Sequence, residues 1–129
     1  MEVSWGAGHR RVLLVEDNID IRDELTQLLV DEGFQVIGVG NGLEALNLLR
    51  QAQLRENPPK VILLDLMMPV MNGWQFLREQ SQDPYLSKIP VVVMSANSDP
   101  QYGVKEELAA TALLCKPVAI DALVVLLHR

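Results

Sequence analysis

Five short apolar runs along the chain alternate with segments that have the period of a helix. The runs occupy residues 12–15, 34–39, 61–64, 90–94 and 112–115. The third run is apolar at every position, as expected of a parallel strand that is covered on both faces. Buried strands that alternate with amphipathic helices are typical of a parallel sheet between two helical layers. The pattern therefore predicts an α/β domain of five β–α units.

Helix signals stand between the runs. Asn18 fits the N-cap of a first helix, and Gly33 suits the position just past its end. Residues 41–44, Asn-Gly-Leu-Glu, have the spacing of a capping box, which predicts a second helix through Leu49. The polar residues 51–60 are expected to form a surface connection. Each signal agrees with the alternation of strands and helices.

Three further helices complete the pattern. Trp74 and Leu77 indicate a third helix, and Asp99-Pro100 is a favourable start for a fourth. The last helix is expected over residues 118–128.

Composition and charge narrow the class of protein. The 129 residues suit one domain, with 49% hydrophobic and 22% charged residues, which indicates a globular chain. A net charge of −6 argues against a nucleic-acid-binding surface. The single cysteine, Cys115, favours a reducing compartment, and no segment has the pattern of a signal peptide or a membrane span. We expect a single cytoplasmic domain over residues 11–129, with residues 1–10 as an N-terminal extension.

Polar residues follow four of the five predicted strands. Glu16 and Asp17 follow the first, Asp65 the third, Ser95 the fourth and Lys116 the fifth. Because sites in open parallel sheets form outside the carboxyl ends of the strands, these residues are expected to meet at one edge.

This set of side chains fits phosphoryl chemistry. Three carboxylates at about 5 Å repel one another by roughly 3 kcal/mol per pair at an effective dielectric near 20. A divalent cation removes that penalty, and Mg²⁺ suits hard oxygen ligands best. Ser95 and Lys116 are suited to phosphoryl oxygens, and Asp65 is a candidate nucleophile that forms an aspartyl phosphate.

Each of these residues also has an ordinary structural explanation. An aspartate after a strand is usually a turn or cap residue, although residues 66–69 do not begin a helix. Glu16 and Asp17 would equally cap the first helix, and Ser95 would be a turn hydroxyl. Lys116 would be a solvated lysine, although Pro117 indicates a fixed turn. The ordered set, rather than any single member, favours a phosphorylation site.

Three segments resemble the receiver domain of two-component response regulators. They are residues 12–18 (Val-Leu-Leu-Val-Glu-Asp-Asn), residues 63–73 (Leu-Leu-Asp-Leu-Met-Met-Pro-Val-Met-Asn-Gly) and residues 115–117 (Cys-Lys-Pro). The resemblance covers residues 11–127. It implies the flavodoxin-like doubly wound (βα)5 fold of chemotaxis regulators, with a five-stranded parallel sheet in the order 2-1-3-4-5.

The resemblance also implies a role for each matching residue. Asp65 corresponds to the phosphoacceptor, which takes the phosphoryl group from a phosphohistidine of a sensor histidine kinase or phosphotransfer protein. Asp17 corresponds to a direct Mg²⁺ ligand, Glu16 to an acidic neighbour that reaches the ion through water, and the backbone carbonyl of Met67 to a third protein oxygen. Such a domain is a signalling module, not a metabolic enzyme, with limited self-phosphorylation and autodephosphorylation.

Two further matches concern signal relay. Ser95 corresponds to the switch hydroxyl and Lys116 to the lysine that pairs with a phosphoryl oxygen, followed by Pro117 after a typically cis bond. Receivers usually carry an aromatic residue three positions before that lysine, where this chain has Leu113, and Gly-Ala where it has Thr111-Ala112. The aromatic step of signalling therefore has no matching residue.

The last helix carries apolar residues on two sides. Val118, Ile120, Leu123, Val124 and Leu127 match the core-facing positions of the family, which leaves Ala122, Val125 and Leu126 outward. We expect this outer stripe to pack against a second receiver or a neighbouring output domain.

Three other functions remain alternatives. An aspartate-nucleophile phosphatase would need a second carboxylate where Met67 stands, and an FMN carrier would suffer repulsion between its phosphate and Glu16-Asp17. A receiver-like docking or dimerisation module that works without phosphorylation ranks above both of these. Because the full set of residues for a phosphorylation site is present, a receiver that is phosphorylated is favoured over this docking module.

Overall fold

The sheet has the predicted composition and order. The computed structural model of the chain describes residues 10–54, 58–95, 112–115 and 120–127; at residues 95, 112–115, 120 and 126–127 it describes the backbone alone. The strands are β1 (Arg11–Val15), β2 (Gln35–Val39), β3 (Val61–Asp65), β4 (Val91–Ser95) and β5 (Ala112–Cys115). All pair in parallel in the order β2-β1-β3-β4-β5, which confirms the predicted flavodoxin-like topology.

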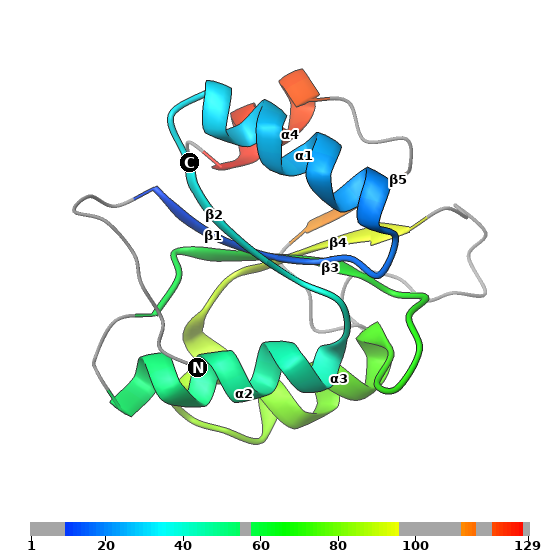
Figure 1. Cartoon of the computed structure of the whole chain (residues 1–129). Coiled ribbons are helices and arrows are strands. Elements are labelled where there is room, and N and C mark those ends of the chain that lie inside the picture. Colours follow the sequence, from blue (N-terminus) through cyan, green and yellow to red (C-terminus); the bar gives the residue numbers. More distant parts are fainter. Residues whose placement is uncertain (1–9, 55–57, 96–111, 116–119, 128–129) are drawn as a thin grey trace.

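Helices cover both faces of this sheet. Figure 1 shows α1 (Ile19–Asp31) and α4 (Ile120–Leu127) on one face, and α2 (Gly42–Leu54) and α3 (Gly73–Ser81) on the other. Successive residues of β1 face opposite layers: Leu13 belongs to the core beneath α2 and α3, while Leu14 belongs to the core beneath α1 and α4. The sheet is thus buried on both sides, as the apolar run in β3 predicted.

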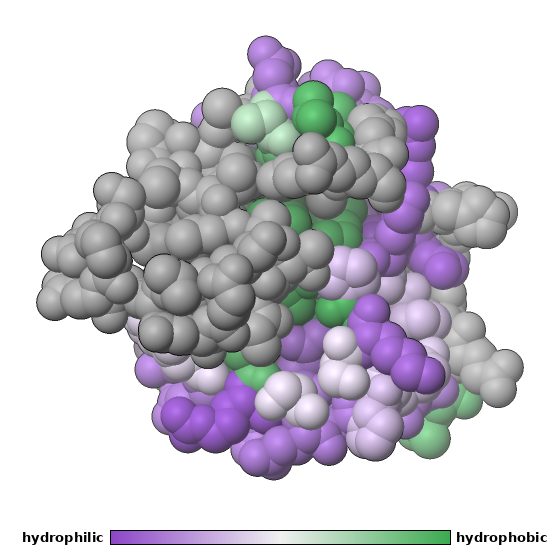
Figure 2. Space-filling model, turned by 180° about the vertical axis from the view of Figure 1, so that it is seen from behind, coloured by the Kyte–Doolittle hydropathy of each residue, from purple (hydrophilic) through white to green (hydrophobic). Residues whose placement is uncertain are grey.

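The surface differs between the two helical layers. Seen from behind, the layer of α2 and α3 is mainly hydrophilic, whereas hydrophobic side chains reach the surface in the layer of α1 and α4 (Figure 2). Within the described part of the chain, no helix is long and apolar enough to cross a membrane.

The helix ends confirm most of the sequence signals. Asn18 caps α1, because its side chain accepts a hydrogen bond from the backbone N–H of Ile21 at 3.0 Å. Gly33 has a φ of +93°, the left-handed conformation that ends a helix without strain in glycine. In α2, Asn41 accepts from the backbone N–H of Glu44 at 2.9 Å, but the Glu44 carboxylate accepts from Gly40 rather than from Asn41. Only one of the two hydrogen bonds of the predicted capping box is therefore present.

One local expectation was wrong, and one short helix was missed. Helix α2 extends to Leu54 rather than ending at Leu49, because residues 50–54 contain only helix-forming side chains and Ala52 is buried in the core. The connection from α3 to β4 contains a short 3-10 helix, η1 (Leu86–Lys88), that the sequence pattern did not predict. The helix expected to begin at Asp99 lies outside the described residues.

Candidate functional site

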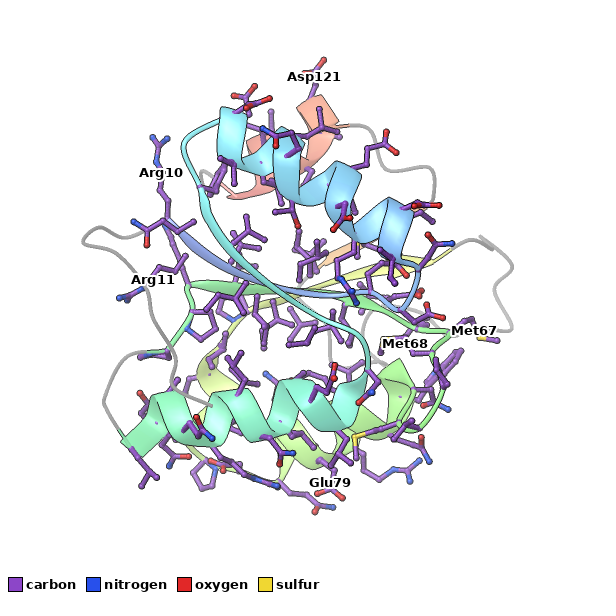
Figure 3. All side chains as sticks on the ribbon, viewed as in Figure 1. Arg10, Arg11, Met67, Met68, Glu79 and Asp121 are labelled. Atoms are coloured by element: carbon purple, nitrogen blue, oxygen red, sulfur yellow. The ribbon has the colours of Figure 1, made fainter. Side chains whose placement is uncertain are left out.

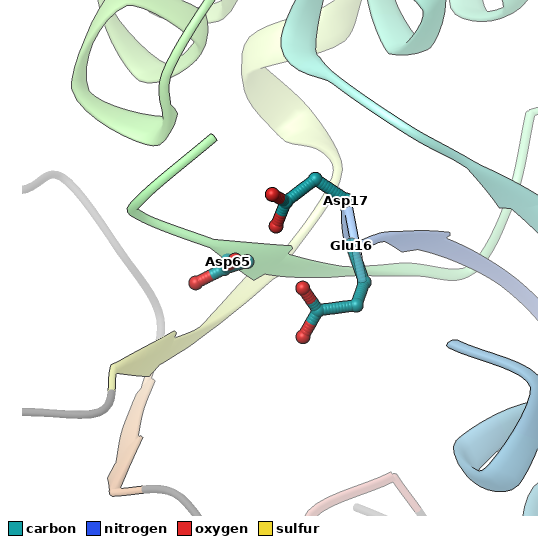
Figure 4. A group of neighbouring side chains, drawn as sticks. All are labelled: Glu16, Asp17 and Asp65. Carbon is teal, nitrogen blue, oxygen red and sulfur yellow. The ribbon is translucent and has the colours of Figure 1, made fainter. Parts of the chain in front are cut away.

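Three carboxylates meet at the carboxyl-terminal edge of the sheet. One ligand oxygen from each of Glu16, Asp17 and Asp65 lies within 4.8 Å of the others. Figure 4 shows the three side chains gathered where β1 and β3 end. The pairing of Val15 with Leu64 explains this, because it brings the residues that follow each to the same level of the sheet. The structure therefore brings together three acidic residues that the sequence placed in separate segments.

Glu16 is the most enclosed of the three. It is fully buried, and its backbone N–H donates to the carbonyl of Val39 at 3.0 Å, which extends the pairing of β1 with β2. Its Oε2 accepts from the backbone N–H of Asn18 at 3.3 Å, and its carbonyl accepts from Nη1 of Arg22 at 3.1 Å. Asp17, by contrast, is exposed. The pair therefore offers one carboxylate from the interior and one from the solvent side.

Asp65 is the last residue of β3 and only 4% exposed. Its Oδ1 accepts a hydrogen bond from the backbone N–H of Met67 at 3.3 Å, as in a turn closed by an aspartate side chain. The turn explanation of Asp65 is thus correct, while the cap explanation is wrong because Asn72 caps α3. Asp65 has a turn role and a place in the acidic cluster at once.

The loop after Asp65 is fixed by backbone contacts. The N–H of Gly73 donates to the carbonyl of Leu66 at 2.9 Å, and that of Gly42 donates to the carbonyl of Met71 at 3.0 Å. A Cβ on Gly73 would lie 2.8 Å from the carbonyl oxygen of Asp65, so only glycine fits this close approach. Met67, with 62% of its surface exposed, lies at the end of the sheet opposite to Arg10 and Arg11 (Figure 3).

The remaining predicted residues are less fully described. The backbone of Ser95 ends β4 and pairs with Cys115, so it lies at the same edge as the carboxylates. Its side chain, that of Leu113, and the whole of Thr111, Lys116 and Pro117 lie outside the described residues.

The donor set fits a divalent cation. Carboxylate oxygens are the hard ligands that Mg²⁺ prefers, and few protein ligands suffice because this ion retains several waters. An exposed Asp17 beside a buried Glu16 leaves a solvent side on which such waters fit. The cluster is therefore suited to a metal ion.

Comparison with known proteins decides the family. Residues 12–128 match the family model described as the response regulator receiver domain. The chain belongs to this family. Receiver domains of two-component systems are signalling domains, in agreement with the resemblance in the sequence.

Relatives of this receiver include short and long proteins. It is 33% identical over 116 residues to protein PilH of Pseudomonas aeruginosa, covering 88% of this chain and 90% of PilH. It is 38% identical over 86 residues to the probable transcriptional regulator ycf29 of Pyropia yezoensis, covering 67% of this chain and 36% of that protein. The chain thus spans about a third of the length of the first transcriptional regulators it matches.

Solved receiver structures are closely similar. The chemotaxis response regulator CheY4 of Vibrio cholerae has a TM-score of 0.79 and 28% identity, covering 95% of this chain and 98% of that one. The receiver domain of the Pseudomonas aeruginosa sensor histidine kinase PA1611, crystallised with a magnesium ion coordinated in its active site cleft, has a TM-score of 0.80 and 25% identity, covering 95% and 97%.

One residue of the receiver's site was missed at the sequence level. Arg22 contacts the carbonyl of Glu16 from α1, although its place in a helical pattern suggests an ordinary solvated arginine. A signal was present in the sequence of β2, because Gly38 interrupts the strand and Gly40 follows its end, and isolated glycines in strands often mark a close approach.

Proposed function

We propose that Asp65 accepts a phosphoryl group from a phosphohistidine on a sensor histidine kinase or a phosphotransfer protein. Glu16, Asp17, Asp65 and the backbone carbonyl of Met67 would hold the Mg²⁺ that this transfer needs. The observation that carries the proposal is the convergence of three carboxylates within 4.8 Å, with Asp65 nearly buried among them. We place the transfer in the cytoplasm, the compartment that a single cysteine favours.

The bound ion would neutralise the phosphoryl oxygens, which removes most of the electrostatic barrier to attack by an anion. A carboxylate oxygen of Asp65 attacks phosphorus, the P–N bond breaks, and its electron pair returns to the imidazole, which takes a proton from solvent. The backbone N–H of Met67 holds Oδ1 of Asp65 and so orients the carboxylate. Attack by water on the aspartyl phosphate then restores Asp65 and releases phosphate, which is the limited self-catalysis of such a domain.

Ser95 and Lys116 would bind the transferred phosphoryl group. The backbone of β4 carries Ser95 to the edge where the carboxylates lie, and Lys116 follows the last residue of β5. A hydroxyl and an ammonium group at these positions supply donors to phosphoryl oxygens. With Leu113 where the family has an aromatic residue, we propose that movement of Ser95 alters the face formed by β4 and β5 by repacking of aliphatic side chains.

Chemical phosphorylation tests this function directly. The protein with Mg²⁺ is treated with acetyl phosphate and followed by intact mass, and with beryllofluoride and followed by tryptophan fluorescence, to which Trp5 and Trp74 both contribute. Wild type should gain one phosphoryl group, Asp65→Asn should gain none, and the exposed acid control Asp23→Asn should behave as wild type. If wild type responds to neither reagent, the chain is instead a docking module that works without phosphorylation.

The outer side of α4 is the proposed contact with a second receiver or an output domain. Leu123 is fully buried, whereas Ala122 is exposed and Val125 is 61% exposed. This agrees with the hydrophobic surface of the layer that contains α4 (Figure 2). Val125→Glu combined with Leu126→Lys should weaken self-association, measured by light scattering of the phosphorylated protein, or should weaken output. Val30→Glu on α1 serves as the control. Unchanged association and output in the double variant would refute the contact.

A further inference from the structure

Arg22 reaches from α1 to the acidic edge across two glycines of β2 and its following turn. Its Nη1 donates to the carbonyl of Glu16 at 3.1 Å in a partly buried position. A Cβ on Gly38 would lie 3.0 Å from Cδ of Arg22, and one on Gly40 would lie 3.3 Å from its Nη1. The arginine side chain therefore lies against the backbone of both glycines.

Space, rather than backbone conformation, explains these glycines. Among the described glycines, positive φ is found at Gly33 alone, so Gly38 and Gly40 adopt backbone conformations open to other residues. Glycine weakens a strand interior, because it adds conformational entropy to the unfolded chain and packs no side chain. Because Gly38 and Gly40 have no side chains, Arg22 has room to reach the carbonyl of Glu16.

We propose that Arg22 is a positioning residue for the metal site. By binding the carbonyl of Glu16, it fixes the peptide that joins Glu16 to Asp17 and so the directions in which both carboxylates leave the chain. This inference rests on the proposed function, in which these carboxylates serve Mg²⁺. Partners of this kind, which orient the groups that hold a metal, typically contribute about 10- to 100-fold to its affinity.

The direction in which loss of Arg22 changes the Mg²⁺ affinity distinguishes a positioning role from an effect of its charge. A guanidinium at the carbonyl of Glu16 adds positive charge near the acidic cluster, so electrostatics alone predicts that loss of Arg22 strengthens Mg²⁺ binding. Positioning predicts the reverse, because an unrestrained Glu16-Asp17 peptide must be ordered when the ion binds.

Calorimetric titration with Mg²⁺ alone is the first measurement. Arg22→Ala should bind Mg²⁺ about 10-fold more weakly than wild type. Arg50→Ala removes the same charge from the far half of α2, and its affinity should remain that of wild type. In the metal-free protein, amide exchange at Asn18 should be faster in Arg22→Ala than in Arg50→Ala, since the turn that holds Glu16 has lost its anchor.

Gly38→Val provides a second variant that leaves the charge unchanged. Valine favours strand backbone, so folding is retained, but its side chain occupies the path of Arg22. It should weaken Mg²⁺ binding in the same direction as Arg22→Ala, and should add little in the Arg22→Ala background because both act through one contact.

The outcomes separate this inference from the function on which it rests. If wild type binds no Mg²⁺, or if Asp17→Asn binds as well as wild type, the proposed function fails. If wild type binds but Arg22→Ala binds equally well or more tightly, the proposed function stands and the positioning role is refuted. Full additivity of Arg22→Ala and Gly38→Val would also overturn it.

Discussion

Val70 has a left-handed backbone, with a φ of +66°, and among the described residues it is the only non-glycine in that region. The backbone N–H of Met71 donates to the carbonyl of Pro69 at 2.7 Å, so Val70 is the centre of a three-residue turn of the rare, strained kind. A β-branched side chain is poorly suited to this conformation. The strain lies in the loop that follows Asp65 and leads into α3.

Replacement of Val70 should therefore stabilise the protein. The side chain is 74% exposed, so little packing is lost. Because left-handed backbone costs an L-residue about 1–2 kcal/mol and asparagine tolerates it better, Val70→Asn should raise the free energy of unfolding by about 0.5–1 kcal/mol. Urea denaturation measures the change. Val70→Ala also removes the β-branch but has no polar side chain to bond the local backbone, so it should gain less. An equal gain from both would show that loss of the β-branch, rather than the asparagine side chain, relieves the strain.

Replacement of Gly73 should destabilise the protein, in contrast to replacement of Val70. A Cβ there would lie 2.8 Å from both the carbonyl oxygen of Asp65 and Cα of Leu66, and backbone atoms cannot move aside as a flexible side chain does. Gly73→Ala should lower the free energy of unfolding by about 2 kcal/mol and slow phosphorylation of Asp65 by acetyl phosphate several-fold. A stability loss with an unchanged phosphorylation rate would show that Asp65 does not move.

At the residue scale, sequence was informative where a side chain acts locally. Asn18 and Gly33 act on backbone groups within a few residues, and both were predicted. Arg22 and Val70 were not, since the course of the Arg22 side chain depends on how α1 crosses β2, and a positive φ in valine contradicts its own preference. The acidic cluster was predicted because strand ends alone determine where Glu16, Asp17 and Asp65 lie.

At the scale of elements, one buried side chain holds the connection between α3 and β4. The Gln80 side chain is 4% exposed, and its Nε2 donates to the carbonyls of Leu86 at 2.9 Å and Ile89 at 3.1 Å. These bonds tie η1 against the end of α3. The strands were predicted within one residue of their observed ends, but η1 was missed. Its local signal is Asp83, whose Oδ1 accepts from the backbone N–H groups of Tyr85 at 2.9 Å and Leu86 at 3.1 Å, whereas the bonds from Gln80 come from a helix six to nine residues earlier.

Loss of the Gln80 amide should be costly. Gln80→Met keeps the length of the side chain but leaves two buried carbonyls without this donor, which should lower the free energy of unfolding by about 2–3 kcal/mol. The exposed neighbour Gln82 offers a matched control, and Gln82→Met should change stability by less than about 0.5 kcal/mol. Chemical denaturation of both variants measures the difference; equal stabilities would mean that water replaces the amide.

For the whole molecule, the parallel sheet gathers the carboxylates at one edge, and this has a cost in stability. Without a cation, Glu16, Asp17 and Asp65 repel one another in the folded protein more than in the extended unfolded chain. The overall fold followed from the sequence because the apolar runs define buried strands. The repulsion between the carboxylates at the strand ends depends on distances between side chains, and these are fixed only in the folded chain.

Asp17→Asn should therefore stabilise the metal-free protein. Since Asp17 is exposed, solvent screening reduces the gain to about 1 kcal/mol, or about 3 °C in Tm, in the presence of EDTA. Mg²⁺ at 100 times its Kd should stabilise wild type by about 2.7 kcal/mol and Asp17→Asn by much less. Differential scanning calorimetry with and without Mg²⁺ measures both effects. A lower Tm of the variant in EDTA would contradict the repulsion.

The acidic edge has a consequence for laboratory evolution of this domain. In a library randomised at codons 16, 17 and 65 and selected for heat resistance without divalent ions, neutral side chains should accumulate, because each one relieves repulsion. The same library selected for response to a phosphodonor should retain the three acids. Selection for stability alone would thus favour sequences that no longer respond to a phosphodonor.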